Sequence, residues 1–167
     1  MHKYIKEKWN RKITNGDTVY ILGDVSMRGK KEELIAFVAQ LKGRKVLIKG
    51  NHDDVSDYRY QQLFHEICDY KEMHDTIGKE HYSLVLSHYP IFSWRNMGRG
   101  RILLYGHTHE SEEDRFYQKC LSEIRANDCR HVYEAEELRA YNVGCMRDYM
   151  NYTPRTLEEI LNSRRKV

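Results

Sequence analysis

The sequence lacks long apolar runs, paired cysteines and an apolar leader. No stretch of about 18 apolar residues occurs in its 167 residues, so we expect no membrane-spanning helix. The residues that follow Met1 contain no apolar segment of the kind found in secretory signals, which favours a cytoplasmic protein. The four cysteines form no C-x-x-C pair, which argues against a zinc ribbon or a disulfide framework and predicts reduced thiols.

A strong excess of charge of one sign is also missing. The formal net charge is +3, and the basic residues are scattered along the chain, so the composition does not favour nucleic-acid binding. Charged residues make up 32% and hydrophobic residues 40% of the sequence, as in a folded protein with a heavily charged surface. The length fits a single domain over residues 1–167.

The apolar residues follow a helical spacing in some segments and form short runs in others. This pattern predicts helices at 1–12, 30–41, 56–65, 112–125 and 157–161, and strands at 18–22, 45–48, 82–86, 102–105 and 140–143. The order of these segments predicts a mixed α/β or α+β sandwich in which helices cover the sheets.

Four of the predicted strands end in a glycine or serine that is followed at once by a metal-ligand type of residue. These residues are Asp24, Asn51, His88 and His107. In open α/β sheets, binding sites gather beyond the carboxyl ends of the strands, so we expect the four side chains along one rim. Oxygen and imidazole ligands without a thiolate suit a catalytic divalent ion such as Mn²⁺, Fe²⁺ or Zn²⁺ better than a structural zinc.

The same segments, taken in order, resemble the calcineurin-like metallophosphoesterase family, and most closely its small bacterial and phage members. They are Gly23-Asp24, Gly50-Asn51-His52-Asp53, Ser87-His88 and Gly106-His107-Thr108-His109. The resemblance implies a two-sheet β-sandwich flanked by helices. It also implies metal-dependent hydrolysis of a small phosphomonoester or phosphodiester by activated water, with one or two divalent ions (Mn²⁺ first, otherwise Fe²⁺, Zn²⁺ or Ni²⁺).

The resemblance further implies a role for each matching residue. Asp24 would bridge two metals, Asn51, His88 and His107 would complete one metal shell, and His109 would belong to the other. His52 would contact the scissile phosphate and protonate the leaving oxygen, with Asp53 orienting it.

The sequence departs from the family pattern at its first motif, an Asp-x-His at the end of the first strand, which is absent. Two interpretations are open. In the first, which we favour, the full gene product has about 30 more residues, because losing a central strand exposes unpaired backbone groups. In the second, the protein is a genuinely short, non-catalytic relic or subunit that binds metal or phosphate. A homodimer could cover the missing strand.

The segment between His109 and Asn142 is longer than the corresponding segment in many small members of the family. We interpret residues 111–139 as a helical insertion near the rim of the site, either a lid or a dimer contact. Arg95 and Arg99 could clamp a substrate phosphate or lie in a solvated loop. Tyr89 and Trp94 are predicted to pack rather than to stack on a nucleobase, and Ser26 is rejected as a nucleophile because no base accompanies it.

Overall fold

The computed structural model describes residues 1–25, 30–129 and 131–164, and Ser26 lies outside these ranges. The helices are α1 (His2–Lys12), α2 (Lys31–Ala39), α3 (Tyr58–Gln61), the 3₁₀ helix η1 (Met97–Arg99), α4 (Glu112–Ala126) and α5 (Leu157–Arg164). The strands are β1 (Thr18–Ile21), β2 (Arg44–Ile48), β3 (Glu66–Cys68), β4 (Tyr70–Ile77), β5 (Glu80–Ser87), β6 (Ile102–Tyr105) and β7 (Ala140–Asn142).

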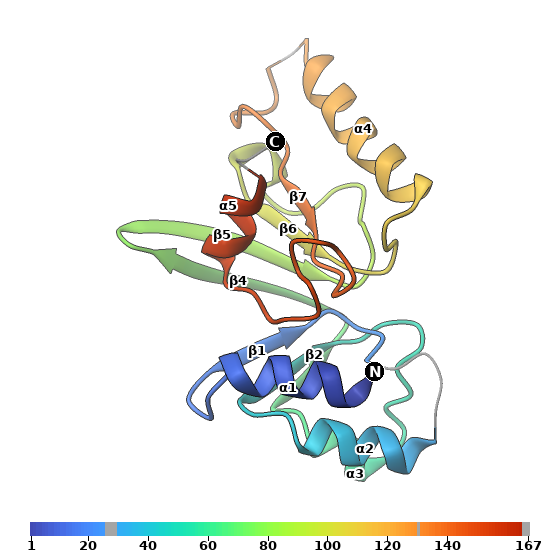
Figure 1. Cartoon of the computed structure of the whole chain (residues 1–167). Helices are drawn as coiled ribbons and strands as arrows, with labels where there is room; N and C mark the ends of the chain where they lie inside the picture. Colours follow the sequence, from blue (N-terminus) through green and yellow to red (C-terminus); the bar gives the residue numbers. More distant parts are fainter. Residues whose placement is uncertain (26–29, 130, 165–167) are drawn as a thin grey trace.

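The strands form two sheets (Figure 1). The first sheet has the order β1-β2-β3 and is parallel throughout. The second has the order β4-β5-β6-β7, in which β4 is antiparallel to β5 and the other pairs are parallel. A single residue, Asp69, separates β3 from β4, so the chain passes from one sheet to the other at that point.

The period-two alternation of strand side chains builds the core between the sheets. In β2, Val46 and Ile48 join a buried cluster with Leu84 and Leu86 of β5, while Leu47 faces the opposite side. Residues of β6 and α5 complete this cluster, namely Ile102, Leu104, Leu157 and Leu161. The sheets therefore pack face to face through aliphatic side chains.

Helices cover the outer faces of both sheets. Helices α1, α2 and α3 pack on the first sheet through a cluster that includes Trp9, Phe37 and Tyr60, and the indole Nε1 of Trp9 donates to the carbonyl of Lys42 at 2.9 Å. Helix α4 covers the second sheet through Tyr117 and Leu121 and rises away from the sandwich at its far end (Figure 1). The predicted helix-flanked two-sheet sandwich is confirmed.

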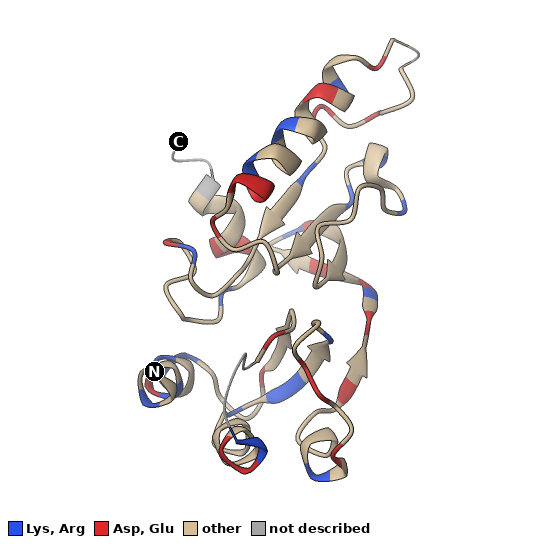
Figure 2. Ribbon diagram, turned by 90° about the vertical axis from the view of Figure 1, so that its right-hand side faces the viewer, with Lys and Arg blue, Asp and Glu red and all other residues tan. Residues whose placement is uncertain are grey.

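The distribution of charge also matches the expectation from composition. Acidic and basic residues alternate along the helices rather than gathering on one element (Figure 2). Among the described residues, no helix combines the length and hydrophobicity needed to cross a lipid bilayer.

The structure differs from the sequence prediction in two places. Strands β3 and β4 were not predicted, because β4 is an edge strand with several half-exposed and exposed positions and carries no apolar run. The helix predicted over 56–65 is wrong in its length, since α3 covers only Tyr58–Gln61. Its start is fixed by the Asp57 side chain, which accepts a hydrogen bond from the backbone N–H of Arg59.

Candidate metal centre

The carboxyl ends of four strands, two from each sheet, meet at one edge of the sandwich. Asp24 and Asn51 follow β1 and β2, whereas His88 and His107 follow β5 and β6. Parallel pairing of β1 with β2 and of β5 with β6 brings each pair of strand ends to the same level. The predicted rim is therefore present.

Two glycines allow the strand ends to approach one another. Gly23 has a φ of +81°, in the left-handed region, and a β-carbon there would lie 2.7 Å from the Cα of Gly50. A β-carbon on Gly50 would overlap the Asp24 carboxylate and lie 2.8 Å from Cε1 of His88. The loops can hold their ligands this close only because neither position carries a side chain.

The side chains of the four residues converge. Nε2 of His88 lies 3.1 Å from Nδ1 of His107 and 3.1 Å from Oδ1 of Asn51. The Asp24 carboxylate is 3.5 Å from the same nitrogen. Ligand atoms of Asp24, His88 and His107 all lie within 4.8 Å of one another.

The tautomer of His88 makes this group of atoms fit a cation. Nδ1 of His88 lies 2.7 Å from the carbonyl oxygen of Leu22, to which it donates, so Nε2 is left with a lone pair directed at the other ligands. His88 is 2% exposed, which leaves little water to satisfy that lone pair. Ligand atoms about 2.1 Å from a shared ion lie about 3.0 to 3.4 Å apart, close to the observed separations.

The remaining motif residues surround this cluster in different ways. His109 is exposed and lies outside the group formed by Asp24, His88 and His107. His52 is exposed as well, and its backbone N–H donates to Oδ1 of Asp24 at 2.9 Å, which holds it beside the cluster. The roles of His52 and His109 remain predictions.

Asp53 has a structural task that the sequence did not suggest. Its Oδ2 accepts the backbone N–H groups of Asp24 at 2.7 Å and Gly50 at 2.9 Å, and its Oδ1 accepts that of Val25 at 3.0 Å. These bonds tie the loop after β1 to the loop after β2. Asp53 therefore positions Asp24, whose φ of +51° is uncommon for a residue with a side chain.

Comparison with known proteins agrees with this geometry. The sequence profile of the calcineurin-like phosphoesterases matches residues 2–148. The chain belongs to the calcineurin-like phosphoesterase family.

Relatives of the chain are found in phages and in Methanocaldococcus jannaschii. The chain is 31% identical to the gene 66 protein of Mycobacterium phage D29 over 128 residues, which is 64% of each chain. The gene 66 protein of Mycobacterium phage L5 is 27% identical over 129 residues, 63% of this chain and 62% of the phage protein. An uncharacterised protein of Methanocaldococcus jannaschii is 27% identical over 117 residues, 70% of this chain and 57% of that protein. The chain thus spans less than two thirds of the length of these relatives.

A solved structure shares the fold. A protein of unknown function from Aquifex aeolicus superposes with a TM-score of 0.62 and 24% identity, over 97% of this chain and 84% of that chain. At this level of identity the likeness concerns the fold alone.

The two arginines predicted as possible phosphate clamps form ion pairs with glutamates in the structure. Arg99 precedes β6, whereas His107 follows it, and a strand of this length spans about 13 Å. Arg95 pairs with Glu72 and Arg99 with Glu134, both at 3.3 Å. The two guanidinium groups are therefore engaged elsewhere.

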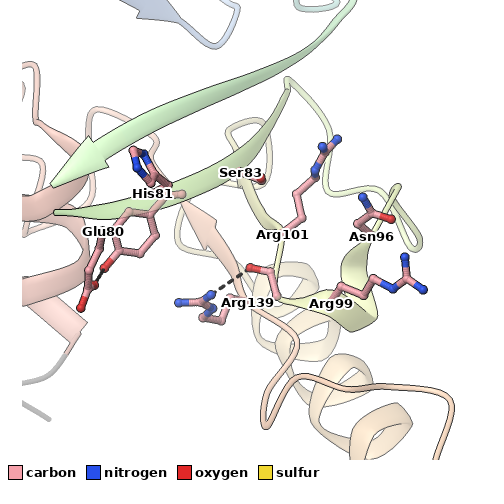
Figure 3. Close-up of a pocket in the computed structure, with 9 residues that line it drawn as sticks. Glu80, His81, Ser83, Asn96, Arg99, Arg101 and Arg139 are labelled. Carbon is pink, nitrogen blue, oxygen red and sulfur yellow. Dashed lines mark hydrogen bonds between the residues drawn. The ribbon is translucent and has the colours of Figure 1, made fainter.

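Arg99 borders a hollow of about 440 Å³ that it shares with Arg101 and Arg139 (Figure 3). The three guanidinium groups point in different directions in Figure 3, and that of Arg139 donates to the carbonyl of Gly100 at 2.8 Å. The hydrogen bond from Arg101 holds the pKa of Glu72 below its ordinary value. This arrangement stabilises the loop before β6 and does not converge on a ligand.

The two aromatic residues of the loop after β5 behave differently. Trp94 is 6% exposed and its Nε1 donates to the carbonyl of Arg101 at 2.8 Å, so its predicted packing role is confirmed. Tyr89 is 45% exposed, and its ring lies 4.7 Å from that of His107 and 4.9 Å from that of His88. Tyr89 therefore packs against the ligands while keeping one side open to solvent.

Sequence reasoning missed two residues that support the candidate metal centre. One is the carbonyl of Leu22, which fixes the His88 tautomer and, as a backbone group, leaves no sequence signal. The other is Asp114, a buried carboxylate in α4 that contacts the loop carrying His107 and His109. Its only signal is the Ser111-x-x-Asp114 spacing of a helix start.

Proposed function

We propose that this chain is a metal-dependent phosphoesterase that hydrolyses a small phosphomonoester or phosphodiester. The observation that carries the proposal is the convergence of Asp24, Asn51, His88 and His107 on one point, with His88 in the tautomer that leaves Nε2 free to bind a metal. Family membership supports the same reaction class. The substrate would be a small phosphate ester.

These four side chains would hold a divalent ion, with Mn²⁺ the first choice and Fe²⁺, Zn²⁺ or Ni²⁺ as alternatives. Such an ion supplies polarisation of the phosphoryl group and activation of water. The chain's own residues fix the ligands in place: the Leu22 carbonyl orients the His88 ring, and Asp53 holds the backbone of Asp24.

The proposed reaction is displacement at phosphorus. The oxygen of a water molecule would bond to phosphorus and lose a proton to the solvent while the P–O bond to the ester oxygen breaks. The products would be an alcohol and either phosphate, from a phosphomonoester, or a phosphomonoester, from a phosphodiester. His52, beside Asp24 and open to solvent, would deliver a proton to the departing alkoxide oxygen. Tyr89, half exposed against the ligand histidines, would face the organic part of the substrate.

The test uses an aryl phosphodiester in the presence of Mn²⁺. His52→Ala should lower kcat by about 100-fold or more, the usual contribution of a general acid, and leave the affinity for Mn²⁺ unchanged in calorimetry. His81→Ala serves as the control, because His81 is exposed and contacts Thr76 at the far end of β5. Full activity of His52→Ala would show that the assigned proton donor is wrong.

A second candidate function is a metal- or phosphate-binding module without turnover. It is favoured by the position of His109, which is exposed and apart from the Asp24, His88 and His107 group, so that one ligand set is assembled in the described residues. Metal stoichiometry separates the two functions. Bound Mn²⁺ with hydrolysis supports the enzyme, one bound ion without hydrolysis supports the module, and no binding contradicts both.

A further inference from the structure

A buried carboxylate contacts the turn that carries His107 and His109. Asp114 of α4 is 5% exposed, and one of its oxygens, Oδ1, accepts three side-chain hydrogen bonds. The donors are the hydroxyl of Tyr105 at 2.6 Å, the hydroxyl of Thr108 at 3.0 Å and the amide of Asn142 at 2.9 Å.

These bonds reach the backbone on both sides of the turn. Thr108 lies between His107 and His109, and its hydroxyl is held by Asp114. The amide of Asn142, which is fully buried, also donates to the carbonyl of His109 at 2.7 Å. The network therefore holds the residue between the two histidines and the backbone of the second one.

The turn needs such support because its conformation is uncommon. His107 and His109 have φ values of +59° and +50°, in the left-handed region that residues with side chains rarely adopt. A conformation of this kind persists only when surrounding contacts impose it. Histidines in such a turn point where the turn directs them, so the order of the turn decides where the ligand nitrogens lie.

Helix α4 is itself anchored so that it can provide this support. Ser111 caps the helix by accepting the backbone N–H of Asp114 at 3.3 Å. Tyr117 and Leu121 then pack into the core over the second sheet. On the second Asp114 oxygen, a guanidinium nitrogen of Arg147 lies 3.7 Å away and balances the buried charge.

We propose that Asp114 is a positioning residue for the metal centre, and that α4 serves to support the histidine turn. The inference rests on the proposed function in one respect, namely that His107 binds the ion. A residue that orients ligands in this way typically changes metal affinity by about 10- to 100-fold when it is removed.

The test compares three variants of the full chain. Asp114→Ala removes the acceptor that three buried donors share. Asp114→Asn keeps an amide oxygen that can accept the same three bonds while losing the charge near Arg147. Leu121→Ala is the matched control, because it removes a buried side chain from the same helix that makes no hydrogen bond to Thr108 or Asn142.

Two measurements are made on each variant at a temperature where all are folded. The first is amide hydrogen exchange over residues 106–110 in metal-free protein, and the second is Mn²⁺ affinity by calorimetry. Asp114→Ala should speed exchange in this turn by at least 10-fold and weaken Mn²⁺ binding by about 10- to 100-fold. Asp114→Asn should restore both to within about 3-fold of wild type, and Leu121→Ala should leave the Mn²⁺ affinity unchanged.

The outcomes distinguish this inference from the proposed function. If wild-type protein binds no Mn²⁺, the proposed function fails, and the exchange data alone then decide whether Asp114 orders the turn. If Asp114→Ala binds Mn²⁺ as tightly as wild type, or if its turn exchanges no faster than that of Leu121→Ala, Asp114 contributes stability only and the inference is overturned.

Discussion

Replacing Asp53 by alanine should destabilise the protein well beyond what the loss of one half-buried carboxylate at a surface loop suggests. The side chain accepts three backbone hydrogens, from Asp24, Val25 and Gly50, at 2.7, 3.0 and 2.9 Å. A hydrogen bond to a charged group contributes about 1.5 to 3 kcal/mol. Because water can reach part of this half-buried site and replace some of the lost bonds, we expect the free energy of unfolding to fall by about 2 to 4 kcal/mol.

The assay is urea unfolding of metal-free protein, followed by far-ultraviolet circular dichroism. With a urea dependence of about 2 kcal/mol per molar, the midpoint of Asp53→Ala should shift down by about 1 to 2 M. Asp53→Asn should lose roughly half as much, because its single carbonyl oxygen can still accept the Asp24 and Gly50 hydrogens. Its amide group would face the N–H of Val25, which is also a donor.

The control is the neighbouring Asp54→Ala. Asp54 is an exposed carboxylate that pairs with Lys31 at 2.6 Å, and exposed pairs contribute little to stability, so we expect no measurable shift. An unchanged midpoint for Asp53→Ala, together with a loss of activity, would refute the reasoning. That result would return Asp53 to the role of orienting His52.

Three further predictions follow from local contacts. Gly50→Ala should abolish Mn²⁺ binding in calorimetry, because the new methyl group would overlap the Asp24 carboxylate, and retention of affinity would show that the loops can separate. Tyr60→Phe should leave the free energy of unfolding in urea unchanged or raise it by up to about 1 kcal/mol, since the buried Tyr60 hydroxyl has no hydrogen-bond partner among the described residues. Glu72→Gln should lower the thermal midpoint at pH 7, and this loss should shrink as the pH is lowered below 4.5. The hydrogen bond from Arg101 depresses the Glu72 pKa below 4.5, so its stabilising contribution is present above that value and is lost as the pH falls through the folded pKa.

The sequence predicted well those features that leave a local pattern. The buried strands were recognised because their apolar runs are short and end at glycine or serine, as at Gly50 and Gly106. The glycine or serine at the end of each strand also indicated which side chains would meet at the rim. Strand β4 was not predicted because it lies at the edge of its sheet. Several of its side chains are exposed to solvent, so its sequence contains no apolar run.

Features that depend on distant contacts could not be predicted from the sequence. The burial of Asp114 results from the docking of α4 against Tyr105 and against Asn142, which lies 28 residues further along the chain. The family resemblance assigned Asp53 to His52, whereas the hydrogen bonds of its side chain cross to the loop after β1. Arg99 was predicted to clamp a phosphate or to lie in a solvated loop, and the sequence could not choose. In the structure Arg99 precedes β6, whereas His107 follows that strand.

The chain passes from the first sheet to the second at Asp69, so a cut at this position would give two fragments with one sheet each. The portion up to Asp69 contains the first sheet with Asp24 and Asn51, and the portion after it contains the second sheet with His88 and His107. Neither fragment holds more than two of the four converging side chains. Since a ligand that binds only the assembled state stabilises that state, an ion at this seam favours reassociation of the two fragments. Recovery of metal affinity on mixing them would therefore signal that the two sheets have come together.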